Sequence, residues 1–248
     1  KQHSAELPAD ASHQQALTVI ANTLKKFETL SQQIVAVGHR VVHGGETFTH
    51  SSLIDDDVKQ AIEQTSLMAP LHNPANLAGI NSAQTTFPDL PHVAVFDTAF
   101  FQTMPKHAYL YALPYELYQQ HHIRRYGFHG SSHYFVANEA ANTLKREFSN
   151  CNLITAHLGN GCSIAAIKQG KAIDTSLGFT PLEGLVMGTR SGDIDPSLPT
   201  YLIEQLGYSV DKVNHLLNNE SGLLGVSKLS NDCRTLEQEV KEGNQQAK

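Results

Sequence analysis

Apolar residues in the first part of the chain follow two different patterns. A spacing of three and four residues predicts an amphipathic helix over about 13–30, with an apolar face formed by Leu17, Ile20, Ala21, Leu24 and Phe27. Two uninterrupted apolar runs, 34–37 and 93–96, are typical of buried strands. The alternation of such strands with helices supports an α/β fold class.

Two further helices are predicted between these strands. The segment from Asp55 to Asp57 can cap the first of them, which then carries Val58 and Ile62 as its apolar residues. The prolines of the segment 70–74 break the chain, and a short helix is expected over about 75–83.

Another helix is predicted after the glycine- and histidine-rich sequence 126–133. Ser131 or Ser132 is expected to cap it, because serine side chains accept hydrogen bonds from the first free N–H groups of a helix. Its apolar face would consist of Phe135, Val136, Ala140 and Leu144.

The remaining elements form a mixed pattern. A third strand is predicted over 153–156, and a hairpin closed by Gln169 and Gly170 is predicted after it, with strands over 162–167 and 171–174. Two helices are expected over about 197–206 and 209–218, the second ending near Gly222. A change of domain is expected near residues 98–105, which divides the chain into domains 1–100 and 101–248.

Composition narrows the classes of protein that this chain can represent. At 248 residues and 40% hydrophobic content, it is long enough for one large or two smaller cores. No apolar run approaches the roughly 20 residues that span a bilayer, so we expect no membrane partner. The net charge of −6 argues against nucleic-acid binding. Three cysteines without a CxxC spacing suit a reducing compartment, and we expect a cytoplasmic protein.

Two glycine-rich segments carry the strongest chemical signal. The first, 157–161, follows the third strand directly, and the second, 187–196, contains Arg190 between Gly188 and Gly192. Glycines let backbone N–H groups approach an anion closely, and a guanidinium offers a planar pair of donors for phosphate or carboxylate oxygens. Together the two segments predict phosphoryl chemistry.

Arg40 and Asp97 each follow a predicted strand. Arg40 lies in a segment with three glycines and the apolar pair Val41-Val42, which suits a short carboxylate with a short alkyl tail, although a surface ion pair is an equal alternative. Asp97 stands at the carboxyl end of its strand, where open α/β sheets carry functional groups. It could hold a metal or simply cap the next turn.

Histidines and aspartates elsewhere admit more than one interpretation. His129 and His133 have the i, i+4 spacing of zinc ligands, but the glutamate of the HExxH motif is absent. A hydrogen-bonding role toward an anion, beside Arg124 and Arg125, explains such a histidine better. Asp193 and Asp195 are interpreted as a turn before the following helix.

Five motifs together resemble the acetate kinases, in the same order and with similar spacing. They are Gly38-His-Arg-Val-Val-His-Gly-Gly45, Phe96-Asp-Thr-Ala-Phe100, His129-Gly-Ser-Ser-His133, His157-Leu-Gly-Asn-Gly161 and Met187–Pro196. The resemblance extends from about residue 33 to 236. It implies a two-domain actin-like ATPase (ribonuclease H-like) fold, with both domains incomplete in this chain.

The resemblance also implies an activity and the residues that perform it. The activity is reversible transfer of the γ-phosphoryl group of ATP to acetate, giving acetyl phosphate and ADP, with Mg²⁺ and in a homodimer. The catalytic residues would be Asp97, His129, Arg190 and Arg40. Acetate would contact Arg40 and a pocket formed by Val42, Leu71, His72, Phe128 and Pro181. The nucleotide would contact His157, Leu158, Gly159, Asn160, Gly161, Asp232, Cys233 and Arg234.

The role expected for Asp97 follows from the chemistry of the substrate. Acetate is already a carboxylate at neutral pH, so the nucleophile needs no general base, and the site must supply alignment and positive charge. Asp97 is therefore expected to orient magnesium or an arginine, although the family's aspartate is usually described as an acid/base.

The comparison with the family leaves alternatives open. The opening strand of the family and its closing segment have no counterpart here, so the chain resembles an internal piece of an acetate kinase. The expected magnesium ligands lie in those segments, no metal ligand is assigned in this chain, and the chain alone is expected to be inactive. Propionate kinase, a catalytically inactive nucleotide- or anion-binding module, and a zinc hydrolase built on His129 and His133 are the competing hypotheses.

Overall fold

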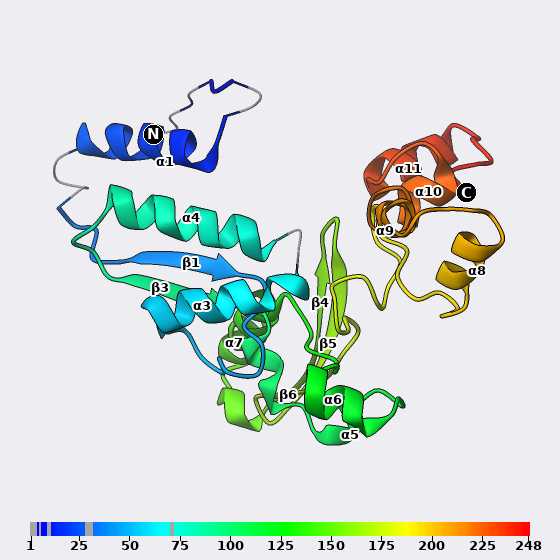
Figure 1. The fold of residues 1–248 in the computed structure, drawn as a ribbon, viewed down its shortest axis with the longest axis horizontal. Helices are drawn as coiled ribbons and strands as arrows, with labels where there is room; N and C mark the ends of the chain where they lie inside the picture. The colour runs from blue at the N-terminus through cyan, green and yellow to red at the C-terminus, as the bar shows by residue number, and fades with distance from the viewer. Residues whose placement is uncertain (1–3, 5, 9–10, 28–31, 70–71) are drawn as a thin grey trace. The chain divides into compact units, whose positions relative to one another are not determined.

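The chain folds into two compact units, Lys1–Ala99 and Phe100–Lys248. The structure is a computed structural model that describes residues 4, 6–8, 11–27, 32–69 and 72–248 (Figure 1). Each unit contains its own three-stranded sheet and its own helices, and is described separately below.

The first unit is built on a parallel strand pair. β1 (Val37–Val41) pairs in parallel with β3 (His92–Phe96), and the short β2 (Ser52–Leu53) adds to β3 in the antiparallel direction. Parallel strands need a long crossover, and here it contains α3, η1 and α4. Their bounds are Asp56–Gln64, Thr65–Leu67 and Asn73–Thr86.

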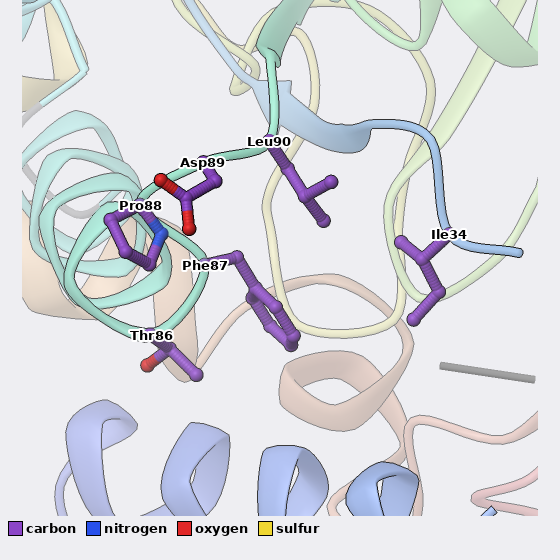
Figure 2. Close-up of a pocket in the computed structure, with 6 residues that line it drawn as sticks. All are labelled: Ile34, Thr86, Phe87, Pro88, Asp89 and Leu90. Carbon is purple, nitrogen blue, oxygen red and sulfur yellow. The ribbon is translucent and has the colours of Figure 1, made fainter. Parts of the chain in front are cut away.

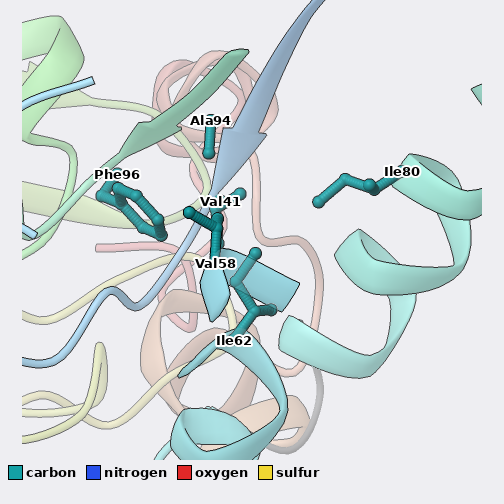
Figure 3. Packing of buried hydrophobic residues seen from close by; sticks show 6 residues of the cluster. All are labelled: Val41, Val58, Ile62, Ile80, Ala94 and Phe96. Carbon is teal, nitrogen blue, oxygen red and sulfur yellow. The ribbon is translucent and has the colours of Figure 1, made fainter. Parts of the chain in front are cut away.

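Helices and strands of this unit share one hydrophobic core. Figure 3 shows side chains from β1, β3, α3 and α4 meeting in it: Val41, Val58, Ile62, Ile80, Ala94 and Phe96. The first helix, α1 (His13–Lys25), packs along α4. Its N-terminus is closed by a capping box in which Ser12 and Gln15 each accept a hydrogen bond from the other's backbone.

The predictions for the first unit are confirmed for α3, capped by Asp55, and for β3, but the first strand was misplaced. The predicted run 34–37 overlaps β1 only at Val37, and Val35 is 80% exposed. β1 instead continues through Gly38, His39 and Arg40, because in-register pairing with β3 supplies backbone hydrogen bonds that apolar periodicity does not report. Arg40 therefore lies in a strand and not in the loop that follows it.

The second unit is built on an antiparallel sheet. β4 (Asn152–Leu158), β5 (Cys162–Lys168) and β6 (Lys171–Thr175) pair in chain order. The predicted hairpin between β5 and β6 is confirmed. Gln169 and Gly170 both have positive φ, 52° and 75°, as a two-residue hairpin turn requires. Phe101, Met104, Ala165 and Ala172 form a buried cluster beside this sheet.

Helix α7 (Gly130–Thr143) packs against β4. The predicted serine cap was wrong: the residue before the helix is His129, in a left-handed conformation with φ 60°. The predicted apolar face was also wrong, because Phe135, Val136 and Leu144 are exposed. Small residues let the helix approach the sheet closely, and the buried face consists of Gly130, His133, Ala137 and Ala141.

The other elements of the second unit are short. Those before β4 are η2 (Ala99–Thr103), α5 (Lys106–Tyr109), α6 (Tyr115–His121) and η3 (Phe148–Asn150). Those after β6 are α8 (Leu198–Glu204), α9 (Val210–Asn219), α10 (Gly222–Ser227) and α11 (Cys233–Lys241). Gly222 begins α10 instead of ending α9. None of the helices in the described part of the chain has the length and apolar character of a membrane span.

Candidate functional site

An arginine–aspartate pair lies at the carboxyl edge of the sheet in the first unit. Nε and Nη2 of Arg40 donate to Oδ1 and Oδ2 of Asp97 over 3.1 and 2.6 Å. The Asp97 side chain is 1% exposed, whereas that of Arg40 is 61% exposed. The in-register pairing of β1 with β3 brings both residues to this edge. These hydrogen bonds to Asp97 raise the pKa of Arg40. Arg40 therefore remains charged, Asp97 fixes the orientation of its guanidinium, and the rest of the guanidinium is exposed.

The segment after β1 is fixed by side-chain amides of α4. The backbone N–H of Val42 donates to Oδ1 of Asn76 and that of His43 donates to Oδ1 of Asn73, each over 3.1 Å. Asn73 is fully buried, and its Nδ2 donates back to the His43 carbonyl. These two asparagines were missed from the sequence. An asparagine on a helix carries no signal that distinguishes a solvated side chain from one that anchors a distant loop.

The same segment leaves no room for larger side chains. A methyl group at Gly44 would lie 2.6 Å from the Phe96 ring, so glycine is required there. His43 is buried, and its Nδ1 accepts from the backbone N–H of Gly45 over 3.0 Å. Burial lowers the pKa of His43 to about 4, so its ring is neutral at physiological pH.

Three histidines gather at the start of α7 and along β4 in the second unit. Nδ1 of His129 lies 2.9 Å from Oγ of Ser163, and Nε2 of His133 lies 2.8 Å from the same oxygen. His157, from β4, stacks on His129 with ring centroids 4.0 Å apart, and its Nδ1 lies 2.9 Å from Oγ of Ser132. Each ring is held by a hydroxyl, which fixes its orientation.

Arg190 lies beside these histidines at the turn between β4 and β5. A methyl group at Gly161 would lie 3.2 Å from Nη1 of Arg190 and 3.4 Å from Cε1 of His129. Nη1 of Arg190 donates to the Pro181 carbonyl over 3.1 Å. Within the described residues Arg190 makes no ion pair, and burial lowers its pKa. A half-buried cation without an acidic partner, next to a glycine turn, is suited to an anionic ligand.

The two predicted glycine-rich segments contact each other. The Gly188 N–H donates to the Asn160 carbonyl over 2.9 Å, and any side chain at Gly188 would overlap the Asn160 amide. The extent of the first loop was mispredicted, because His157 and Leu158 belong to β4 and only 159–161 form the turn. Strand pairing with β5 holds those two residues extended.

The segment 231–234 adjoins the same turn. Nδ2 of Asn231 donates to Oδ1 of Asn160 over 2.9 Å. Asp232 caps α11 and pairs with Arg234 over 2.6 Å, and these hydrogen bonds lower the pKa of Asp232 to about 2. Cys233 is exposed at the first position of α11.

Arg124 and Arg125 contact aromatic and acidic side chains of the second unit. Arg125 donates to Oε1 of Glu183 over 2.6 Å and to the Thr175 carbonyl over 3.0 Å, while Tyr111 also hydrogen-bonds Glu183. The guanidinium carbon of Arg124 lies 3.8 Å from the centroid of the Tyr109 ring. These contacts with aromatic and acidic residues distant in sequence could not be predicted from the neighbouring residues.

The aspartates of the second glycine-rich segment close turns. Oδ1 of Asp195 accepts from the Ser197 N–H over 2.8 Å, which confirms a turn before α8. Oδ1 of Asp193 accepts from the Gly184 N–H over 2.7 Å, which holds the loop around Gly184 in place.

A zinc site on His129 and His133 is disfavoured by the hydrogen bonds of His133. Its Nδ1 lies 2.7 Å from Oγ1 of Thr155 and its Nε2 faces Ser163, so both ring nitrogens are engaged. Among the described residues, no three histidine, cysteine, aspartate or glutamate side chains gather as a metal would need.

The remaining sequence-predicted site residues are distributed over both units. Val42 and Phe128 are buried, and His72 stands immediately before α4. Pro181 contributes its carbonyl to Arg190. Leu71 lies outside the described residues.

A cavity of about 250 Å³ lies in the first unit, next to the segments that precede β1 and β3. Figure 2 shows its lining, which is contributed by the segments entering β1 and β3: Ile34, Thr86, Phe87, Pro88, Asp89 and Leu90. Ligand-binding groups of parallel sheets gather at the carboxyl ends of the strands, which is the edge occupied by Arg40 and Asp97. The cavity is therefore separate from the candidate site.

Both units thus combine an α/β framework with a cationic group suited to a small oxyanion. Comparison with known proteins identifies the family: residues 1–248 match the Acetokinase family throughout. The acetate kinase of Shewanella amazonensis is 56% identical over 100% of the chain and 62% of its own length. That of Shewanella loihica is 57% identical over 98% of the chain and 61% of its own length.

Solved structures agree with the sequence comparison. Porphyromonas gingivalis acetate kinase superimposes with a TM-score of 0.88 at 49% identity, covering 95% of this chain and 60% of that one. A propionate kinase from Francisella tularensis superimposes with a TM-score of 0.93 at 48% identity, covering 98% and 62%. The chain belongs to the acetokinase family, which confirms the predicted resemblance and fold. It spans about 62% of the length of the curated relatives.

Proposed function

We propose that this chain carries the acetate-binding and phosphoryl-transfer residues of an acetate kinase, which transfers the γ-phosphoryl group of ATP to acetate. One observation carries this proposal beyond family membership. Arg190 is half-buried, has no acidic partner among the described residues, and shares the space around Gly161 with His129. A desolvated guanidinium is costly unless an anion binds to it, and a phosphoryl group in transfer is such an anion.

In this proposal Arg40 binds the acetate carboxylate. Its guanidinium is fixed by Asp97 on one side and exposed on the other, which leaves donors for a second carboxylate. Both Asp97 oxygens accept from Arg40, so the aspartate acts by positioning the arginine. Acetate needs no deprotonation to act as the nucleophile, which is consistent with that role.

His129 and Arg190 stabilise the transferred phosphoryl group. The charge of that group spreads over its equatorial oxygens, and N–H donors aimed at those oxygens lower the barrier. The turn 159–161 and the backbone around it bind the ATP phosphates, and the segment 232–234 that adjoins the turn contacts the nucleoside. The acetate methyl group is expected to contact Val42 and His72 of the first unit and Phe128 and Pro181 of the second.

We assign no magnesium ligand among the residues that the structure describes. Both oxygens of Asp97 are engaged by Arg40, and no cluster of three potential ligands occurs among the described residues. We therefore assign no step to the metal in this chain.

Propionate kinase is the second candidate, favoured by the similarity to the Francisella structure. The two acids differ by one methylene, which an apolar pocket distinguishes by about 1–3 kcal/mol. We further propose that the protein forms a homodimer. The free thiols of all three cysteines suit the cytoplasm.

The test is acetyl phosphate formation by the full-length protein, trapped as the hydroxamate, with ATP and either acetate or propionate. A higher kcat/KM for acetate is expected. A higher value for propionate would favour the second candidate, and no acyl phosphate from either acid would refute both. Sedimentation of the same preparation checks the dimer.

A further inference from the structure

We propose that Thr155, His133 and Ser163 form a hydrogen-bonded chain that fixes His129 in the tautomer with its proton on Nε2. These three are positioning residues, because they act on the ligand only through His129. The consequence for phosphoryl transfer rests on the function proposed above, whereas the tautomer itself does not.

The chain is continuous and shielded from water. Oγ1 of Thr155 lies 2.7 Å from Nδ1 of His133, whose Nε2 lies 2.8 Å from Oγ of Ser163. The same oxygen lies 2.9 Å from Nδ1 of His129. Thr155, His133 and Ser163 are all buried, so water does not compete for these contacts.

The number of protons allows only two directions along this chain. Each hydroxyl has one proton to donate, and a neutral imidazole has one N–H. Burial, followed by the influence of His157, lowers the pKa of His133 to about 4, so its ring is neutral. If both histidines donated to Ser163, its hydroxyl proton would need another acceptor, and the described residues provide none. Ser163 therefore donates to one histidine and accepts from the other.

Thr155 decides between the two directions. If Nδ1 of His133 donated to Thr155, the hydroxyl proton of Thr155 would need another acceptor, and the described residues provide none. A buried donor without an acceptor is unfavourable. Thr155 therefore donates to Nδ1 of His133, Nε2 of His133 donates to Ser163, and Ser163 donates to Nδ1 of His129.

This direction leaves the His129 proton on Nε2, the nitrogen that faces Gly161. A methyl group at Gly161 would lie 3.5 Å from Nε2 of His129 and 3.2 Å from Nη1 of Arg190, so both groups adjoin the same point. His157 stacks on the His129 ring, which restricts the ring plane while Ser163 holds its edge. An N–H donor on Nε2 complements phosphoryl oxygens, whereas a lone pair there would repel them.

The direct test replaces Ser163 in the full-length protein and measures both kinetics and tautomer. Ser163→Ala should lower kcat by about 10–100-fold, the cost typical of removing the hydrogen-bonding partner that orients a metal-binding histidine. The KM values for acetate and ATP should stay within about twofold, because Ser163 contacts neither. Ser163→Thr keeps the hydroxyl and should recover most of the activity.

Ser176→Ala is the matched control. Ser176 accepts from the backbone N–H of Ile164 in the same sheet but does not belong to the hydrogen-bonded chain. Its replacement should lower the melting temperature while leaving kcat unchanged.

Testing Ser163→Ala in a protein that lacks the His129 side chain separates an effect through His129 from a general loss of structure. In a His129→Ala protein, Ser163→Ala should cause no further loss of kcat, because it acts only through that histidine. An equal loss in both backgrounds would overturn the proposal.

Nitrogen NMR of ¹⁵N-histidine-labelled protein tests the tautomer without any assay of activity. The His129 signals, assigned by difference with His129→Gln, should show Nε2 protonated in the unchanged protein, and Ser163→Ala should mix the two tautomers. A proton on Nδ1 in the unchanged protein would overturn the proposal, even if Ser163→Ala fails to fold. Absence of acetyl phosphate formation with Nε2 protonated would refute the proposed function alone.

Discussion

Replacing Asp97 by asparagine separates positioning of Arg40 from acid/base chemistry. Asparagine has nearly the same shape, but its NH₂ group would face a donor of Arg40 where a carboxylate oxygen now accepts over 2.6 or 3.1 Å. The variant therefore loses at least one charge-assisted hydrogen bond and turns the guanidinium away from its present orientation.

The magnitude follows from the exposure of the two partners. A hydrogen bond to a charged group contributes about 1.5–3 kcal/mol. The Arg40 side chain is 61% exposed, so solvent screening reduces this, and we expect a loss of about 1–2 kcal/mol in the free energy of unfolding. Misplacing a substrate-binding group by about 1 Å costs roughly 10²-fold in rate, and we expect kcat/KM for acetate to fall by that factor.

The assay is the pH dependence of acetyl phosphate formation by the full-length protein, together with urea unfolding. If Asp97 positions Arg40, Asp97→Asn lowers kcat/KM by a similar factor at every pH. The control is Asp56→Asn, which removes an exposed carboxylate that pairs with Lys59 over 3.0 Å and should change neither quantity.

Two results would refute this role for Asp97. A loss confined to one limb of the pH profile would identify Asp97 as an acid or base. An equal loss caused by Asp97→Asn in an Arg40→Ala background would show that the aspartate acts independently of the arginine.

Three further predictions concern other residues of the site. Arg190→Ala should lower kcat by about 10³–10⁵-fold with much less effect on ATP binding, and a loss under about tenfold would remove Arg190 from the phosphoryl site. Val42→Ala should raise the propionate-to-acetate ratio of kcat/KM by at most about 10–200-fold, and an unchanged ratio would locate the methyl pocket elsewhere. Because the folded-state pKa of His43 is about 4 and that of an unfolded histidine is about 6.5, the unfolded state binds more protons between these values. His43 should therefore reduce the unfolding free energy by up to about 3 kcal/mol as the pH falls from 6.5 to 4. Urea titrations should show a shallower pH slope for His43→Gln, and an identical slope would contradict the buried neutral ring.

Local signals in the sequence identified most elements and the family. Asp55 caps α3, and the Gln169-Gly170 turn closes its hairpin, because capping and turn chemistry involve only neighbouring residues. The apolar run that ends at Phe96 delivers Asp97 to a strand end, as predicted. The order and spacing of the five motifs were sufficient to identify the acetokinase family, because each motif is contiguous in the chain.

Features that depend on distant partners required the tertiary structure. β1 was misplaced because its hydrogen bonds come from β3, more than fifty positions away, and not from its own apolar pattern. The face of α7 was mispredicted because close packing on a sheet favours small residues over large apolar ones. Asn73 and Asn76 were missed because nothing local marks an amide that hydrogen-bonds a remote backbone.

The sequence by itself determined which chemical groups are present and which family they belong to. Only the tertiary structure decided their partners: Arg40 pairs with Asp97, Arg125 with Glu183, and Ser163 lies between two histidines. The physical reason is that hydrogen bonds and ion pairs depend on direction and on distances of about 3 Å, and these are set by strand register and helix packing. Residue identity limits what each group can do, and the fold determines which of those possibilities is realised.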